Sequence, residues 1–181
     1  MRTALELFAR EGYGHVSISM LSKKAGISKG LMYNYFPGKE ALLKEILKEG
    51  VAEVKKSLDP DHDGVLTTSE FELFIRRTFQ LMRDNREFYT TFFGLVVQPN
   101  VKALLKESAF VSFMDSYFGL FEAYFSEMGF EDPLLEVFQL SVSLEGFGIM
   151  MMYYDDLTDI PEELFRKYEE RIIATYTKPK S

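Results

Sequence analysis

The sequence predicts an all-α protein, and three observations support this. Apolar residues recur at spacings of three and four over long stretches, no alternating strand pattern persists, and the interruptions are short groups of Gly, Pro, Asp or Asn. We expect roughly three short helices in the first 50 residues, a long helix over 39–58, and five or six longer helices after it. The later breaks are predicted at Asp84-Asn85, Pro99-Asn100, Gly129 to Pro133, and Thr158 to Pro161.

The three short helices have recognisable ends. The first carries an apolar face and stops at Gly12. Ser17 is placed to cap the second helix and Ser28 to cap the third, because a serine hydroxyl accepts from the free backbone amides of a first turn. Gly26 predicts a tight turn between these two helices, and the third helix ends near Phe36.

The composition excludes several classes of protein. Without cysteine among its 181 residues, the chain has neither a disulfide framework nor a thiolate metal site. No apolar run approaches the roughly 18 residues of a membrane span, and the start lacks the order of a signal peptide. We therefore expect a soluble cytoplasmic protein without a membrane partner.

The net charge of −7 conceals a difference between the two ends of the chain. Residues 1–50 contain eight Lys and Arg against five Glu, whereas the rest contains 13 basic residues against 23 acidic ones. Only the first segment therefore suits a phosphate backbone.

The stretch "ALELFAREGYGHVSISMLSKKAGISKGLMYNYFPGKEALLKEIL" contains several short motifs in a fixed order. They are "LF" and Gly12 in the first helix, Ser17 and Leu21 in the second, "AGIS" at the turn, and then "GLMYNYF" and "KEALL". Together they resemble the N-terminal domain of TetR-type transcriptional regulators. The resemblance implies a three-helix helix-turn-helix DNA-binding domain over 1–47, joined by the long helix to a larger helical effector-binding and dimerisation domain over 48–181. The family's first helix usually begins earlier, so we expect a truncated start.

A recognition helix brings its N-terminal end into the major groove, where small residues and hydrogen-bonding side chains are needed. Lys29 suits a guanine edge or a phosphate, Gly30 permits close approach of the backbone, and Asn34 offers both a donor and an acceptor. By resemblance, Ser17, Tyr35 and Lys39 contact phosphates. The predicted DNA-binding residues are Ser17, Ser28, Lys29, Gly30, Tyr33, Asn34, Tyr35 and Lys39.

These positions also have a plain structural interpretation. Ser17 and Ser28 would cap helices in any helical protein, and Lys39 also suits a solvated surface. The residues of this segment expected in the core rather than at DNA are Leu31, Met32 and Phe36.

The rest of the chain is rich in Phe, Tyr and Met, as in "FYTTFFGLVV", "FVSFMDSYFGLFEAYF" and "FGIMMMYY". Flexible thioethers and flat rings suit an adaptable pocket for a small apolar effector, although most of them suit a core equally well. The family resemblance implies a homodimer through 134–154 and 161–176. The residues predicted to line the pocket are Phe79, Met82, Phe92, Phe113, Met114, Phe147 and Met151.

Residues 59–70, "DPDHDGVLTTSE", have acidic residues at the first, third and fifth places, glycine at the sixth and glutamate at the twelfth. That spacing is typical of the calcium loop of an EF-hand. The alternative is a capping box between Thr67 and Glu70 that starts the next helix. The predicted Ca²⁺ ligands are the side chains of Asp59, Asp61 and Asp63, the carbonyl of Val65, Thr67, and a bidentate Glu70.

No catalytic arrangement stands out in the sequence. The two histidines, His15 and His62, are far apart, and the chain has no Gly-rich phosphate loop and no serine elbow. We therefore expect a non-enzyme that requires no cofactor. The predicted function is a homodimeric, ligand-responsive transcriptional regulator on a palindromic operator, most often a repressor in this family. The alternative is a calcium-binding EF-hand-like sensor module, in which metal rather than an organic effector is the signal.

Overall fold

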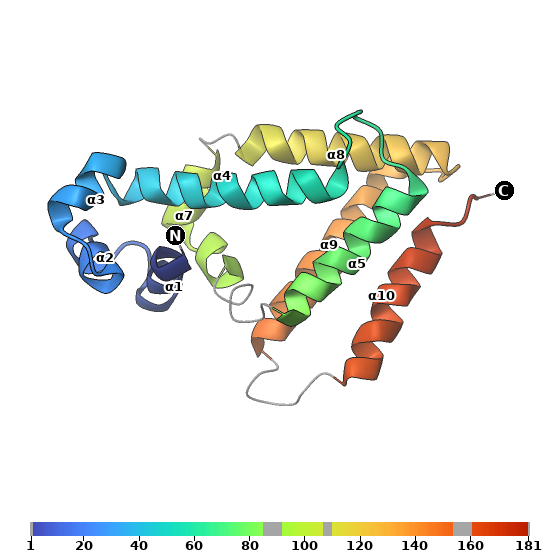
Figure 1. Cartoon of the computed structure of the whole chain (residues 1–181). Helices are drawn as coiled ribbons and strands as arrows, with labels where there is room; N and C mark the ends of the chain where they lie inside the picture. Colours follow the sequence, from blue (N-terminus) through green and yellow to red (C-terminus); the bar gives the residue numbers. More distant parts are fainter. Residues whose placement is uncertain (1, 85–91, 107–109, 154–160, 181) are drawn as a thin grey trace. The chain divides into compact units, whose positions relative to one another are not determined.

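A computed structural model describes residues 2–84, 92–106, 110–153 and 161–180, with the backbone alone at residues 50, 51, 53–55, 110, 113 and 151–153. Every regular element in those ranges is an α-helix, which confirms the predicted all-α fold (Figure 1). The helices are α1 (Arg2–Glu11), α2 (Ile18–Ala25), α3 (Lys29–Tyr35), α4 (Lys39–Leu58), α5 (Thr68–Asp84), α7 (Pro99–Lys106), α8 (Phe110–Glu127), α9 (Pro133–Tyr153) and α10 (Glu162–Tyr176). A further helical stretch covers 92–96.

Most helix ends lie where the sequence predicts them. Gly12 and Gly129 follow α1 and α8 with φ angles of 80° and 81°, which glycine adopts without strain. The break predicted at Pro99-Asn100 lies two residues earlier, at Val97-Gln98, and Pro99 begins α7. Proline suits a first helical turn, where its fixed φ is favourable and its missing N–H has no partner to lose. Two parts of the other predicted breaks, Asn85 and 158–160, lie outside the described residues.

The chain divides into two compact units. The first is formed by Met1–Ala52 and Glu87–Phe113, and the second by Glu53–Arg86 and Met114–Ser181. The functional division predicted from the sequence, into 1–47 and 48–181, concerns roles rather than contacts and stays a prediction.

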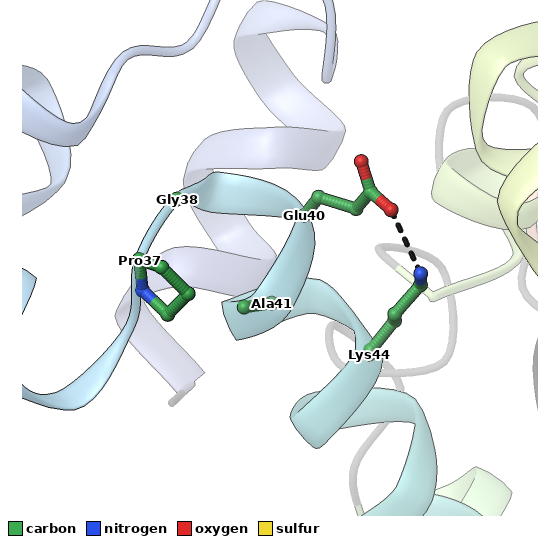
Figure 2. A pocket seen from close by; sticks show the side chains of 5 residues that line it. All are labelled: Pro37, Gly38, Glu40, Ala41 and Lys44. Atoms are coloured by element: carbon green, nitrogen blue, oxygen red, sulfur yellow. Dashed lines mark ion pairs between the residues drawn. The ribbon is translucent and has the colours of Figure 1, made fainter.

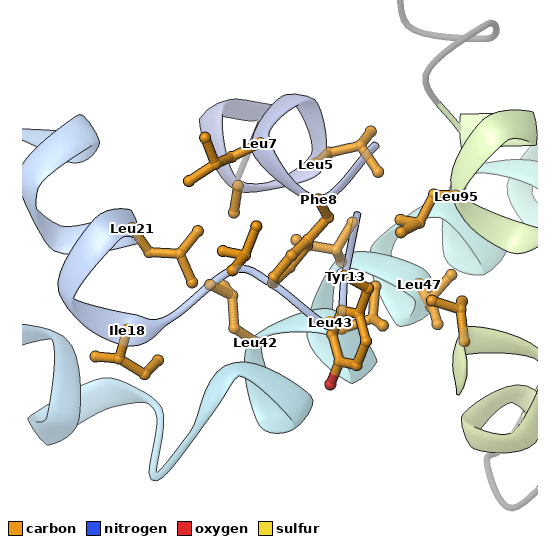
Figure 3. Close-up of a cluster of buried hydrophobic side chains, with 14 of the residues drawn as sticks. Leu5, Leu7, Phe8, Tyr13, Ile18, Leu21, Leu42, Leu43, Leu47 and Leu95 are labelled. Atoms are coloured by element: carbon orange, nitrogen blue, oxygen red, sulfur yellow. The ribbon is translucent and has the colours of Figure 1, made fainter. Parts of the chain in front are cut away.

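In the first unit, α1 supplies the centre of a small apolar core (Figure 3). Leu5 and Phe8 are almost fully buried, and the Phe8 ring lies 5.0 Å from that of Tyr13. Gln98 joins the later part of this unit to α1, because its amide oxygen accepts from the Tyr13 backbone N–H at 2.8 Å and its amide nitrogen donates to the Phe8 carbonyl at 3.4 Å. The other buried members of the core are Ala4, Leu7, Val16, Ile18, Leu21, Met32, Leu42, Leu43, Ile46, Leu47, Leu95 and Val101.

Aromatic rings fill the core of the second unit. Phe71 at the start of α5 is fully buried and stacks on Tyr124 of α8, with 5.0 Å between ring centroids and 10° between planes. The Tyr124 hydroxyl donates to the Tyr176 carbonyl at 2.8 Å, so this polar group of the core is satisfied. A second group of rings surrounds Phe79, which lies 5.2 Å from Phe147. These contacts hold α5, α8, α9 and α10 together.

A buried carboxylate also joins α5 to α10. Glu169 is 5% exposed, and its two oxygens accept from Arg76 at 3.2 Å and from Arg83 at 3.1 Å. Arg76 donates in addition to Glu72 and Glu170. Each charge in this group has a partner of opposite sign, which is the condition under which a carboxylate is tolerated inside a protein.

None of the helices in the described ranges combines the length and the apolar character needed to cross a membrane.

Candidate functional site

Helices α2 and α3 are joined by a turn whose geometry is set by local hydrogen bonds. The Ser17 hydroxyl accepts from the Met20 N–H at 3.3 Å and starts α2. At the other end Gly26 adopts a φ of 69°, and the Ile27 N–H donates to the Ser22 carbonyl at 3.0 Å. A left-handed glycine with these bonds ends a helix and turns the chain sharply. The predicted helix-turn-helix geometry follows directly from these residues.

Helix α3 is held by one side only. The Ser28 hydroxyl accepts from the Leu31 N–H at 3.1 Å and caps the helix, and Met32 is its one buried residue. The remaining side chains point outward, with Tyr33 at 47% and Tyr35 at 71% exposed. The predicted contact residues of α3 that share this exposed surface are Ser28, Lys29, Gly30, Tyr33, Asn34 and Tyr35.

The expectation that Leu31 is a core residue is wrong, because it is 41% exposed. A seven-residue helix buries one narrow stripe, and Met32 occupies it. Phe36 of the same expectation is half-buried and packs on the core of the first unit.

The electrostatic character of this surface is uniform. No Asp or Glu occurs between Glu11 and Glu40, and the exposed lysines of α2 and α3 are therefore not neutralised within the segment. The Lys29 ammonium lies 5.8 Å from the centre of the Tyr33 ring, a contact that orients the lysine without removing its charge. Lys23 and Lys24, which were not among the predicted DNA-binding residues, lie in the last turn of α2 and are exposed. The acid-free run was the signal that could have identified them.

Gly30 lies in the first turn of α3 and has no structural need to be glycine. A Cβ at this position would meet only the Ser28 hydroxyl, at 4.0 Å, and the φ is not in the left-handed region. Glycine costs a helix roughly 1 kcal/mol relative to alanine. Nothing within the described residues requires this position to lack a side chain. The glycine instead leaves room for an external molecule against the backbone of α3.

Lys39 has a role within the first unit. Its ammonium donates to the carbonyls of Tyr13, Gly14 and Val16 at 2.7, 2.9 and 2.9 Å, and it lies 4.7 Å from the centre of the Tyr13 ring. An ammonium has three N–H donors, and these carbonyls use all of them. The structure therefore argues against the predicted phosphate contact of Lys39 and makes this residue a clamp between α4 and the loop before α2.

A surface hollow lies beside the start of α4 (Figure 2). It has a volume of about 320 Å³ and is lined by Pro37, Gly38, Glu40, Ala41 and Lys44. The two charged side chains pair with each other, with 2.7 Å between Lys44 Nζ and Glu40 Oε1. None of the predicted effector residues lines this hollow, so it does not correspond to the predicted apolar pocket.

The predicted effector residues are divided between the two units. Phe79, Met82 and Phe147 lie in the second unit and are buried, the two rings packing against Phe165 and each other. Phe92 belongs to the first unit, where it packs on the apolar core. Met114 is half-buried in the second unit, and the side chains of Phe113 and Met151 lie outside the described residues. A common pocket for these residues stays a prediction.

The acidic loop contains both a cluster of carboxylates and a capping box, the two alternatives considered from the sequence. Carboxylate oxygens of Asp59, Asp61 and Asp63 all lie within 4.8 Å of one another. Glu70 is not part of this group, because its Oε2 accepts from the Thr67 N–H at 2.9 Å and from the Thr67 hydroxyl at 2.7 Å. The capping box is therefore formed, and it occupies the carboxylate that was predicted as the bidentate ligand.

Comparison with known proteins identifies the N-terminal segment. Residues 1–46 match the family described as bacterial regulatory proteins, tetR family. The HTH-type transcriptional regulator YuxN of Bacillus subtilis is 51% identical over 47 residues, which are 26% of this chain and 16% of that protein. Residues 1–46 therefore carry the N-terminal domain of the TetR family. The fatty acid metabolism regulator protein of Bacillus subtilis is 31% identical over 80 residues, 44% of this chain and 41% of that protein. The matched regions thus span less than half of these two relatives.

Solved structures of two regulators extend the likeness in fold to nearly the whole chain. The fatty acid degradation regulator FadR of Bacillus halodurans superposes with a TM-score of 0.70 at 18% identity, covering 94% of this chain and 91% of that one. FadR of Bacillus subtilis in complex with stearoyl-CoA gives 0.69 at 17% identity, covering 99% and 96%. At these identities the likeness concerns the fold alone. All four of these proteins are named as regulators rather than enzymes.

The Lys39 clamp predicts a stability effect. Lys39→Met keeps much of the apolar stem but removes three charge-assisted hydrogen bonds, and we expect the free energy of unfolding to fall by about 2 kcal/mol. Chemical denaturation measures this loss. Lys48→Met is the matched control, because Lys48 makes an exposed pair with Glu45 at 3.1 Å and should change stability by less than about 0.5 kcal/mol. Equal effects of the two substitutions would show that the clamp is not stabilising.

Proposed function

We propose that the chain is a transcriptional regulator that binds double-stranded DNA through α3 and responds to a small apolar effector. The observation that carries this proposal is the surface of α2 and α3, which is exposed, basic, free of acidic residues and attached to the core through Met32 at α3. A helix presented in this way can enter a major groove with its N-terminal end against the bases. The regulator acts in the cytoplasm, where operator DNA is accessible.

The contacts are divided between base reading and positioning. Lys29 and Asn34 lie on the exposed surface of α3 and have the donors and acceptors that read base edges. Ser17 and Tyr35 contact phosphates at the start of α2 and the end of α3, where they set the position of the helix on the duplex. Tyr33 supports Lys29 through its ring. Ser28 caps α3 and contributes an amide-rich helix start that favours a phosphate.

A homodimer through α9 explains an apolar surface that the chain leaves exposed. Leu135, Phe138, Val142 and Ile149 are 47%, 65%, 52% and 40% exposed and follow one another at spacings of three, four and seven. This repeat presents an apolar stripe, interrupted by the exposed Glu145, to a partner helix. A Cβ at Gly146, next to the stripe, would meet nothing within 4 Å of the described chain, which permits close approach. Two copies related by twofold symmetry would read a palindromic operator.

The effector we propose is an acyl chain or a molecule of similar apolar character. The second unit supplies Phe, Tyr and Met side chains that can rearrange around such a ligand, including Phe79, Met82 and Phe147. The FadR of Bacillus subtilis, whose fold this chain shares, was solved with stearoyl-CoA. Effector binding would release the operator, which makes the protein a repressor that needs no further cofactor and performs no catalysis. The match of residues 1–46 to the TetR family favours this regulator over the calcium-sensor alternative.

Gly30→Ala separates DNA binding from folding. Alanine is the better helix former, so the free energy of unfolding should rise by about 0.5–1 kcal/mol. The added methyl group would obstruct a closely approaching duplex, and we expect operator affinity to fall about tenfold, equivalent to ~1.4 kcal/mol. Gly119→Ala is the control, because Gly119 lies within α8 with nothing within 4 Å of its Cβ position. If both variants bind the operator like the unchanged chain, α3 does not approach DNA closely at Gly30.

Phe138→Glu tests the dimer. Phe138 is 65% exposed, so a charge there should leave the fold of one chain intact while preventing two apolar stripes from meeting. Analytical ultracentrifugation should show a dimer for the unchanged chain and a dissociation constant at least 100-fold weaker for the variant. Val97→Glu, at a residue that is 64% exposed on the first unit, should remain dimeric. A Phe138→Glu variant that sediments as a dimer would exclude this surface as the interface.

The effector proposal predicts release of the operator by acyl chains. Stearoyl-CoA titrated into the chain–operator complex should lower DNA affinity at least tenfold. The operator fits only the dimer form in which the two α3 helices lie at one particular separation, and the effector would favour a different form. Free CoA, which lacks the chain, is the control and should have no effect. Fluorescence anisotropy of labelled operator measures both. Operator affinity that is unchanged by stearoyl-CoA and by shorter acyl-CoA molecules would eliminate acyl chains as effectors.

A further inference from the structure

The loop between α4 and α5 contains a buried carboxylate that the rest of the fold does not explain. Asp59 is 6% exposed and lies directly after α4. Its Oδ2 accepts from the Gly64 N–H at 3.3 Å, whereas its Oδ1 is buried and accepts no hydrogen bond from the described residues. A buried carboxylate oxygen without a partner is unfavourable, because water that would solvate it has been excluded. Some ligand with positive charge would remove that penalty.

Two further carboxylates lie beside that of Asp59. Asp61 and Asp63 are exposed, and each offers an oxygen within 4.8 Å of the others and of Asp59. Backbone amides hold the carboxylates in orientation, since Asp63 Oδ1 accepts from the Val65 N–H at 2.8 Å and Asp61 Oδ1 accepts from the Asp63 N–H at 3.4 Å. Three negative groups thus converge around one point, with a buried side on Asp59 and an open side toward solvent.

The backbone of the loop and its anchors favour this convergence. His62 and Gly64 have φ angles of 62° and 76°, and these left-handed residues turn the chain so that alternate side chains approach one another. Leu58 before the group and Leu66 after it are 1% and 3% exposed, so both ends of the loop are fixed in the core of the second unit. The carboxylates are therefore held together before any ligand arrives.

We propose that Asp59, Asp61 and Asp63 bind one Ca²⁺ ion, with the free Oδ1 of Asp59 as its buried ligand. Oxygens on opposite sides of a calcium ion lie up to about 4.6–5.2 Å apart, given Ca–O distances of about 2.3–2.6 Å. The carboxylate oxygens of the three aspartates lie within 4.8 Å of one another, so they fit around a calcium ion without moving. Magnesium requires oxygens within about 4.2 Å and gives up its water reluctantly, so the loop would have to contract. The ion neutralises the three carboxylates and fixes the junction between α4 and α5.

Glu70 is not needed for this site in the observed conformation. Its carboxylate is held by Thr67 at the start of α5. With three carboxylate ligands and water completing the coordination, the affinity should be weak, with a dissociation constant on the order of 10⁻⁴ M. The site is separate from the DNA-binding surface, and its existence does not depend on the proposed function.

Calorimetric titration of the full chain, freed of metal with a chelator, tests the site without DNA. We expect one Ca²⁺ per chain and at least tenfold weaker binding of Mg²⁺. Asp61→Asn and Asp63→Asn alter exposed side chains, so they should keep the helical circular dichroism spectrum and lose at least tenfold in Ca²⁺ affinity. Asp132→Asn is the matched control, because Asp132 is an exposed loop aspartate that caps α9 by accepting from the Leu135 N–H at 3.1 Å. It should bind Ca²⁺ like the unchanged chain.

Asp59→Asn gives an independent readout. Asparagine keeps an acceptor for Gly64 and removes the negative charge, so the unfolding midpoint without metal should be no lower than that of the unchanged chain. Calcium should raise the midpoint of the unchanged chain and leave that of Asp59→Asn unaltered. Absence of saturable heat up to 5 mM Ca²⁺, equal affinity for Mg²⁺, or Ca²⁺ binding by Asp61→Asn at unchanged affinity would each overturn the proposal.

Discussion

The N-terminal unit depends on the three hydrogen bonds that the Lys39 ammonium donates. This ammonium joins the first residue of α4 to three carbonyls in the loop that precedes α2, and this loop ends at Val16, the residue before the Ser17 cap. Because Met32 is the one buried residue within α3, the position of this helix depends on the elements on either side. The clamp fixes both of them, since α2 leads into α3 and α4 leads away from it. A small unit can thus present an exposed helix in a defined orientation with few core residues.

The acidic loop illustrates how one stretch of sequence serves two structural purposes. Thr67 and Glu70 satisfy each other at the start of α5 and need no metal to do so. The aspartates a few residues earlier differ, because Asp59 retains a buried oxygen that local hydrogen bonds leave unsatisfied. A capping box therefore accounts for the end of the loop and not for its beginning.

Local features of the fold could be read from the sequence. Caps at Ser17 and Ser28, and the turn at Gly26, depend on residues within five positions of one another, so their chemistry is visible in the order of the chain. The role of Lys39 could not be read in this way. Its partners are backbone carbonyls 23 to 26 residues earlier, and carbonyls leave no mark in a sequence. The exposure of Leu31 was missed for a related reason, since periodicity does not tell which of two adjacent apolar residues a short helix buries.

Helices α2 and α3 form the surface that we propose to read DNA. Selection of binding sites from random duplex DNA by the full chain, at about 150 mM salt, tests this proposal most directly. The account predicts enrichment of an inverted repeat, bound with an affinity that falls steeply as salt rises, because lysines on this surface displace counterions from phosphates. Failure to enrich any sequence, or binding that does not depend on salt, would contradict it.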